Sequence, residues 1–180
     1  MSGSTPGVIV FLDRTWDDQP VGPDEQVTLF LMAAQNGGIY AKFIAPFHGD
    51  PPPSAPPGPT DRLWEHEVVE LFIAGEGEPV PYTEVEVGPY GHTLVLRLRG
   101  VRRVEESLLP IRATVGREGG VWEVDFTIPP ELLPPGPYRF LACAVHGPPE
   151  ARRYLCWPPL PSPKPDFHQP DRWAPLRFPT

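Results

Sequence analysis

The sequence predicts an all-β protein, an antiparallel β-sandwich with proline-rich loops. Three observations support this fold class. Apolar and polar residues alternate over many short segments, turn-forming residues separate these segments, and no stretch has the longer period of a useful amphipathic helix. Eight or more strands at this spacing are typical of a sandwich. The length of 180 residues predicts a single domain over residues 1–180, with residues 1–7 expected to be flexible.

The first half of the chain contains a predicted hairpin and a proline-rich loop. Alternating residues over 27–32 and 39–45 flank Asn36-Gly37-Gly38, a turn that favours a hairpin. Residues 51–60 then carry a run of prolines. Because proline has no backbone N–H to donate, we expect this run to stay out of the sheet ladders as an extended, polyproline-like loop.

A second hairpin is predicted over residues 82–98, around the turn Gly88-Pro89-Tyr90-Gly91. Pairing the two glycines places Tyr82 opposite Arg97 and puts Glu86 on the same face. Polar residues then meet polar residues on one face and apolar residues meet on the other, so the register is self-consistent.

The remaining predicted strands cover residues 111–115, 121–128 and 138–145, with one short helical turn at 130–133. The middle strand alternates cleanly, and its core side is predicted to hold Trp122, Val124, Phe126 and Ile128.

The segment from Trp64 to Ile73 is interpreted as one apolar strand that carries the candidate site. Because strand side chains alternate, its even-numbered residues share one face. That face combines the ring of Trp64 with the carboxylate of Glu70, a stacking plane and a hydrogen-bond acceptor that suit a sugar-like or other polar ligand. The alternative is a central sandwich strand in which Glu70 pairs with a nearby arginine.

Motifs along most of the chain carry a family resemblance. The chain resembles family-nine carbohydrate-binding modules and the related DOMON-like sandwiches, and it resembles more closely an uncharacterised protein family found in vertebrates and bacteria. The closer match rests on Thr15-Trp16-Asp17, Ala45-Pro46-Phe47, Asp50-Pro51-Pro52, Leu63-Trp64, Glu67-Val68-Val69-Glu70, Glu84-Val85-Glu86-Val87, Ala144-Val145-His146-Gly147 and Pro165-Asp166-Phe167-His168.

The resemblance to the sugar-binding modules implies a ligand site. In those modules two aromatic rings clamp the ligand, and Trp64 and Phe167 stand at the matching positions. Glu70 matches the ligand-contacting glutamate. Glu86 replaces an arginine of the modules, which exchanges a donor for an acceptor, and by the register above Arg97 would supply the missing donor. The candidate ligand-binding residues are therefore Trp64, Glu70, Phe167, Glu86 and Arg97.

The charge of the chain limits the kinds of partner that it can bind. With 15 basic and 23 acidic residues the formal charge is −8, so a nucleic-acid backbone would be repelled. The cluster of Arg97, Arg99, Arg102 and Arg103 is interpreted as a solvated edge. No segment has the length and apolar character needed to span a membrane, and the N-terminus lacks the pattern of a secretory signal, so a cytoplasmic protein is expected. The sequence does not indicate an oligomeric state.

No cofactor, metal site or catalytic motif is predicted. Cys143 and Cys156 have neither zinc-ligand nor Cys-x-x-Cys spacing; one disulfide between them stays open, and Cys143 is expected to be a small buried hydrophobe. The pairs His48 with Asp50 and Asp166 with His168 could each face an ion, but they have no metal-motif spacing, and the metal stays unassigned.

Three functions follow from these observations. The favoured hypothesis is a non-catalytic binding module for a small polar ligand, such as a saccharide. The alternative is a hydrolase that acts on a glycoside-like substrate with Glu70 and either Glu84 or Glu86 as acid and base, because facing carboxylates with separated pKa values are how glycosidases work. A further alternative is an interaction or scaffold protein.

Overall fold

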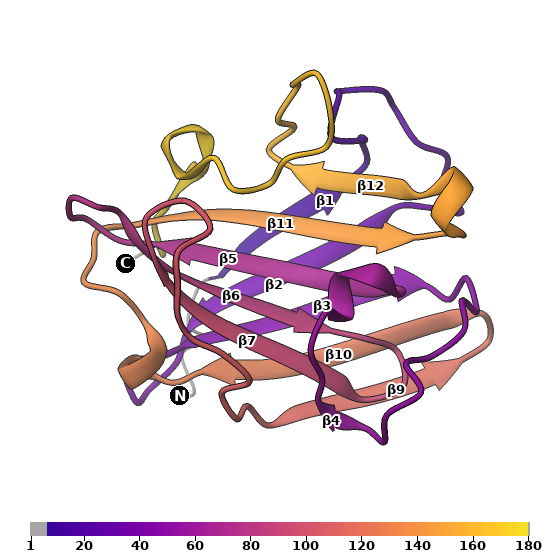
Figure 1. Ribbon diagram of the computed structural model, residues 1–180, viewed down its shortest axis with the longest axis horizontal. Helices are drawn as coiled ribbons and strands as arrows, with labels where there is room; N and C mark the ends of the chain where they lie inside the picture. Colours follow the sequence, from indigo (N-terminus) through magenta and orange to yellow (C-terminus); the bar gives the residue numbers. More distant parts are fainter. Residues whose placement is uncertain (1–6, 180) are drawn as a thin grey trace.

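The chain folds into two β-sheets packed face to face (Figure 1). The computed structural model describes residues 7–179; the flexibility expected for residues 1–7 therefore concerns residues that, apart from Gly7, lie outside the description. All strand pairings are antiparallel except one, so the predicted antiparallel sandwich is confirmed.

The smaller sheet has five strands. In spatial order they are β1 (Val8–Leu12), β2 (Val27–Ala33), β3 (Ile39–Pro46), β10 (Val121–Ile128) and β9 (Ala113–Glu118). Strand β10 alternates as predicted and buries Trp122, Val124, Phe126 and Ile128. Strand β9 begins two residues later than expected. The alternating pattern thus identified four of the five strands of this sheet, and β1 was not predicted.

The larger sheet has eight strands, and two of them lie beside the main order. That order is β12 (Arg153–Trp157), β11 (Tyr138–His146), β5 (Val68–Ala74), β6 (Pro81–Val87), β7 (His92–Arg99) and β4 (Gly58–Pro59); β13 (Ala174–Leu176) pairs with β11, and β8 (Val104–Glu106) pairs with β7.

Four 3-10 turns complete the described structure. They are η1 (Leu63–Glu65), η2 (Pro130–Leu132), η3 (Pro149–Ala151) and η4 (Pro170–Arg172), and η2 confirms the helical turn expected at 130–133. Within residues 7–179, no helix is long and apolar enough to cross a membrane.

The larger sheet buries both of its faces, and this feature positions the site. Val69, Leu71 and Ile73 of β5 point into the main core between the sheets. On the other side, Phe72 packs with Trp173 in a second apolar cluster beneath the C-terminal segment. That segment, yellow in Figure 1, runs over the outside of the sheet. Every residue of β5 and β6 is consequently buried.

The register predicted for the second hairpin is wrong by one residue. Val85 pairs with Val95, and Arg97 pairs with Thr83 instead of Tyr82. The loop has three residues and ends in Gly91, whose φ is 87°. Gly88 lies opposite His92, and its N–H donates to the His92 carbonyl. Because strand side chains alternate, this slip moves Arg97 to the opposite face from Glu86.

The expectation that the proline run stays out of the sheet ladders is also wrong. Gly58 and Pro59 pair in parallel with the start of β7. The N–H groups of Gly58 and Thr60 donate to the carbonyls of Gly91 and Thr93, at 3.1 and 2.8 Å. Pro59 stands between these two donors, at a position whose N–H would point away from β7, so its missing donor costs nothing there.

Cys143 and Cys156 lie directly opposite each other on β11 and β12 as buried free thiols. Burial raises the pKa of the Cys143 thiol well above its usual value, which agrees with its expected role as a small apolar residue.

Candidate functional site

A cleft of about 410 Å³ opens on the outer face of the larger sheet, on the side away from the main core. It lies between the sheet, the turn η1, the loop after β7 and the C-terminal segment. Its lining residues are Trp64, Glu70, Phe72, Glu84, Leu96, Leu98, Arg102, Val104, Val145, Tyr154, Pro165, Asp166, Phe167 and His168.

Two glutamates from neighbouring strands form the polar floor of this cleft. Glu70 comes from β5 and Glu84 from β6, and both are buried. Glu86 stands directly opposite Glu70 across the two strands, but its side chain is 0% exposed and does not line the cleft. Because β6 alternates, Glu84 and Glu86 share the outer face, so three carboxyl groups gather on one side of the sheet.

Burial makes ionisation of these carboxyl groups unfavourable. Desolvation raises the pKa of Glu84 to about 7. It also raises the pKa values of Glu70 and Glu86 well above their usual range, with a further contribution from the neighbouring glutamates. Oε2 of Glu84 and both carboxyl oxygens of Glu86 have no hydrogen-bond partner among the described residues. The floor therefore holds hydrogen-bonding capacity that the chain itself leaves unused.

The C-terminal segment supplies one wall of the cleft. The ring of Phe167 packs edge-on against Phe72 and Tyr154, with centroids 6.4 and 6.2 Å apart. The Nδ1 atom of His168 forms a 2.8 Å hydrogen bond with the Tyr82 hydroxyl. Burial, followed by the nearby Arg102, lowers the pKa of His168 to about 4, so this imidazole is neutral at pH 7.

The loop after β7 supplies the one basic side chain of the cleft. Arg102 donates to Asp166 Oδ1 at 2.7 Å, and its backbone N–H donates to the Tyr82 hydroxyl at 3.0 Å. Arg102 therefore ties the loop to the C-terminal wall. Arg99, Arg102 and Arg103 are exposed to solvent, as the sequence indicated, but the edge of β7 is not left unpaired, because β8 and β4 pair with β7 on that side.

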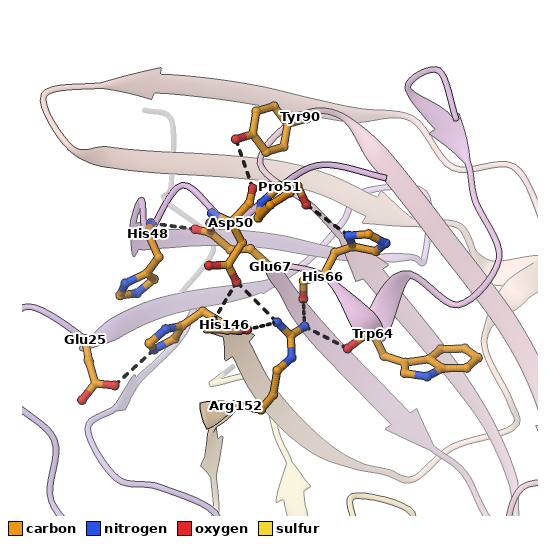
Figure 2. Close-up of polar contacts among 11 residues, drawn as sticks. Glu25, His48, Asp50, Pro51, Trp64, His66, Glu67, Tyr90, His146 and Arg152 are labelled. Carbon is orange, nitrogen blue, oxygen red and sulfur yellow. Dashed lines mark hydrogen bonds and ion pairs between the residues drawn. The ribbon is translucent and has the colours of Figure 1, made fainter. Parts of the chain in front are cut away.

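Trp64 is placed by a network of backbone contacts, shown in Figure 2. It belongs to η1, not to the strand, because Arg62 adopts φ 57° and turns the chain before β5 begins. Arg152 donates to the carbonyls of Trp64 and His66, and its Nη1 lies 3.3 Å from Asp50 Oδ2. The indole points away from this network and remains 43% exposed.

A second carboxylate orders the loop that holds Asp50. Glu67 accepts the backbone N–H groups of His48 and Asp50 at 3.0 and 3.1 Å, and Asp50 in turn accepts the N–H of Gly147 at 2.7 Å (Figure 2). Three segments far apart in the sequence are thereby fixed to one another, and Arg152 joins them to η1.

The histidines do not assemble around an ion. The rings of His48 and His146 stack at 3.5 Å between centroids, and Nε2 of His146 lies 3.1 Å from a Glu25 oxygen. Between residues 7 and 179, no group of three or more His, Cys, Asp or Glu side chains is placed to hold a metal ion.

The structure brings three of the five sequence-predicted site residues into one cleft: Trp64, Glu70 and Phe167 all line it. Glu86 lies behind the floor. Arg97 is on the other face and pairs with Glu106 at 2.9 Å, so the prediction that it shares the floor with Glu86 is wrong, and the one-residue register shift is the reason.

Comparison with known proteins places the chain in a family. No family model matches it. It is 36% identical to the mouse "UPF0462 protein C4orf33 homolog" over 177 residues, which cover 94% of this chain and 91% of that protein. The human UPF0462 protein C4orf33 is 36% identical over 165 residues, covering 87% and 81%. The zebrafish homologue is 34% identical over 167 residues, covering 88% and 83%.

The chain belongs to the UPF0462 family.

A solved structure shares the fold of this UPF0462 protein. It is a crystal structure of a "putative carbohydrate-binding protein" from Bacteroides uniformis, with a TM-score of 0.74 and 18% sequence identity, covering 93% of this chain and 84% of that one. The likeness confirms the sandwich architecture.

The candidate ligand-binding residues named from the sequence omit several residues that line the cleft of this UPF0462 protein. Glu84 was named only as a possible acid or base of the hydrolase alternative, although it shares the alternation of Tyr82 and Glu86. Arg102, Tyr154 and Asp166 reach the cleft from loops and an edge strand, and only the tertiary arrangement brings them together.

Proposed function

We propose that the outer-face cleft binds a small polar ligand, a saccharide, without catalysing a reaction on it. The observation that carries this proposal is that an exposed indole and a buried carboxyl group line the same cleft. Trp64 offers a half-exposed ring to the same cleft that Glu84 lines, and Oε2 of Glu84 has no partner among the described residues.

The chemistry of the cleft suits a sugar ring. Its volume of about 410 Å³ falls within the range of small-molecule sites. The apolar face of a pyranose stacks on an aromatic ring, while its hydroxyl groups need hydrogen-bond partners at the ring edge. Trp64 and Phe167 supply the first property, and Glu70 and Glu84 supply the second. The description of the Bacteroides uniformis protein as carbohydrate-binding agrees with this proposal.

The experiment is a glycan and metabolite binding screen on the purified protein, followed by calorimetry of each hit with Trp64→Ala. A stacked ring contributes of order 1 kcal/mol beyond the area it buries, so affinity should fall at least severalfold. Because Trp64 is half exposed, the melting temperature should change little.

The matched control is Phe11→Ala, which removes a ring of comparable exposure from β1 of the other sheet. It should leave affinity unchanged. If no ligand emerges from the screen, or if Trp64→Ala lowers only the melting temperature, the binding proposal is contradicted and the ring is a cover for the sheet.

A hydrolase is the second candidate, and one observation favours it. A glutamate with its pKa near 7 beside a second carboxyl group has the property of a general acid in glycosidases. Aryl glycosides offered at pH 6–7 would test it. Turnover that disappears in Glu70→Gln or Glu84→Gln, with the fold intact by circular dichroism, would replace the binding proposal with this one; absence of turnover across a broad panel would remove it.

A further inference from the structure

We propose that the ligand of the outer-face cleft carries a protonated amine that lies against Glu70 and Glu84, and that within the saccharide class it is an amino sugar. The inference rests on the proposed binding function and adds the charge of the ligand to it.

The first step is the charge of the cleft. Of its lining residues, Glu70, Glu84 and Asp166 are acidic, and Arg102 is the one lysine or arginine. Arg102 already pairs with Asp166 at 2.7 Å. The two floor glutamates are therefore left without a cationic partner among the residues that line the cleft.

The second step concerns the groups behind the floor. Arg152 is close enough to favour the charged form of Glu70, but its guanidinium is already bonded to Asp50 and to the carbonyls of Trp64, His66 and Gly147. Arg102 favours the charged form of Glu84 in the same way, but its guanidinium is bonded to Asp166. The remaining titratable groups that act on the two floor glutamates are each other, Glu86 and Cys156, and none of them supplies a positive charge.

The third step compares ligands. A neutral sugar hydroxyl can share a hydrogen bond with a protonated glutamic acid, and this leaves the buried acids uncharged. An ammonium group makes charge-assisted bonds to the carboxylates, which are about twice as strong as neutral ones. It also gains from the faces of nearby rings, and both Trp64 and Phe167 line the same cleft.

Binding of an amine should change the number of protons that the protein holds. Glu84 is largely protonated below pH 7 in the free protein, because burial raises its pKa to about 7. A bound ammonium would favour the carboxylate, so binding at pH 6.5 should release a proton to the buffer. A neutral sugar would release none.

The experiment is calorimetry of glucosamine, N-acetylglucosamine and glucose at pH 6.5, in two buffers with different enthalpies of ionisation. Benzylamine serves as an amine without a sugar ring. We expect glucosamine to bind at least tenfold more tightly than the two neutral sugars, with net proton release. Glu84→Gln and Glu70→Gln should remove the preference.

Glu123→Gln is the matched control, because it removes one acidic group from an exposed pair on β10 of the other sheet and should change nothing. Equal binding of all three sugars would overturn the inference and leave the binding function standing. Binding of benzylamine alone, lost in Glu84→Gln, would support the cationic site and overturn the saccharide proposal. If none of the four probes binds, the amine inference fails, while the binding function is decided by the wider screen described above.

Discussion

Glu84 is one of three buried glutamates whose ionisation ties the stability of this protein to pH. Its side chain is buried on β6, and its pKa is raised from 4.5 to about 7. A raised folded-state pKa means that the folded protein holds the proton more tightly than the unfolded chain. Between pH 4.5 and 7 the free energy of unfolding therefore falls as pH rises, and above pH 7 this group has no further effect.

The first prediction compares Glu84→Gln with the natural protein by urea unfolding at several pH values. The difference in the free energy of unfolding should shift in favour of the variant by about 3 kcal/mol between pH 4.5 and 7.5. His146 and His168, whose pKa values are lowered to about 4, titrate in both proteins and cancel in the difference. Glu70 and Glu86, whose pKa values the Glu84 charge helps to raise, add to the difference with the same sign. A difference that stays constant with pH would contradict a raised pKa at Glu84.

At the scale of elements, the hairpin of β6 and β7 shows what sequence alternation can predict, the position of the strands, and what it cannot, their register. Alternation located both strands. Alternation did not fix the loop length, because the predicted pairing and the observed three-residue loop both place apolar residues opposite apolar residues. A slip of one residue nevertheless decides which side chains reach the cleft. The same limit explains Trp64: the 3-10 turn depends on the left-handed Arg62 and on carbonyl bonds to Arg152, 88 residues beyond Trp64.

The second prediction concerns how η1 is held. Arg152→Ala should lower the free energy of unfolding by about 3 kcal/mol, because it leaves a part-buried Asp50 carboxylate without its cation. Hydrogen exchange should accelerate over residues 63–67, because the carbonyls of Trp64 and His66 lose their donor. The affinity for the proposed ligand should fall as η1 becomes less ordered.

The neighbouring arginine provides the control for this experiment. Arg153 pairs with Glu25 at the surface, and Arg153→Ala should cost no more than about 1 kcal/mol without faster exchange at 63–67. Equal effects of the two substitutions would show that Arg152 does not position η1.

At the scale of the whole molecule, the periodic signal predicted the fold class and much of the core, but not the closing of the cleft. Strand β10 was predicted to the residue because one face is buried and the other is largely exposed. Residues 158–173 have no periodicity, and their position over β11 and β5 comes from contacts such as Phe72 with Trp173. Phe167 entered by resemblance alone. The single domain over residues 1–180 stays a prediction.

The third prediction follows from the total charge of −8. Gel-shift assays at moderate salt should show no complex with single- or double-stranded DNA or RNA, because the phosphate backbone is repelled. Three of the four arginines near β7 are also already paired with acidic groups: Arg97 with Glu106, Arg99 with Glu105 and Arg102 with Asp166. Micromolar binding that weakens steeply with added salt would contradict this expectation.

The wall formed by Asp166, Phe167 and His168 also determines at which stage of synthesis and folding the cleft forms. Glu70 and Phe167 are separated by 97 positions, so during synthesis the floor emerges from the ribosome long before its cover. Contacts this distant in sequence form late in folding, since loop closure must come first. Until then the outer face of β5 and β6 exposes Phe72 and Tyr82 beside their acidic neighbours. The proposed ligand should therefore bind only after residues 165–168 have been synthesised and have packed against the sheet.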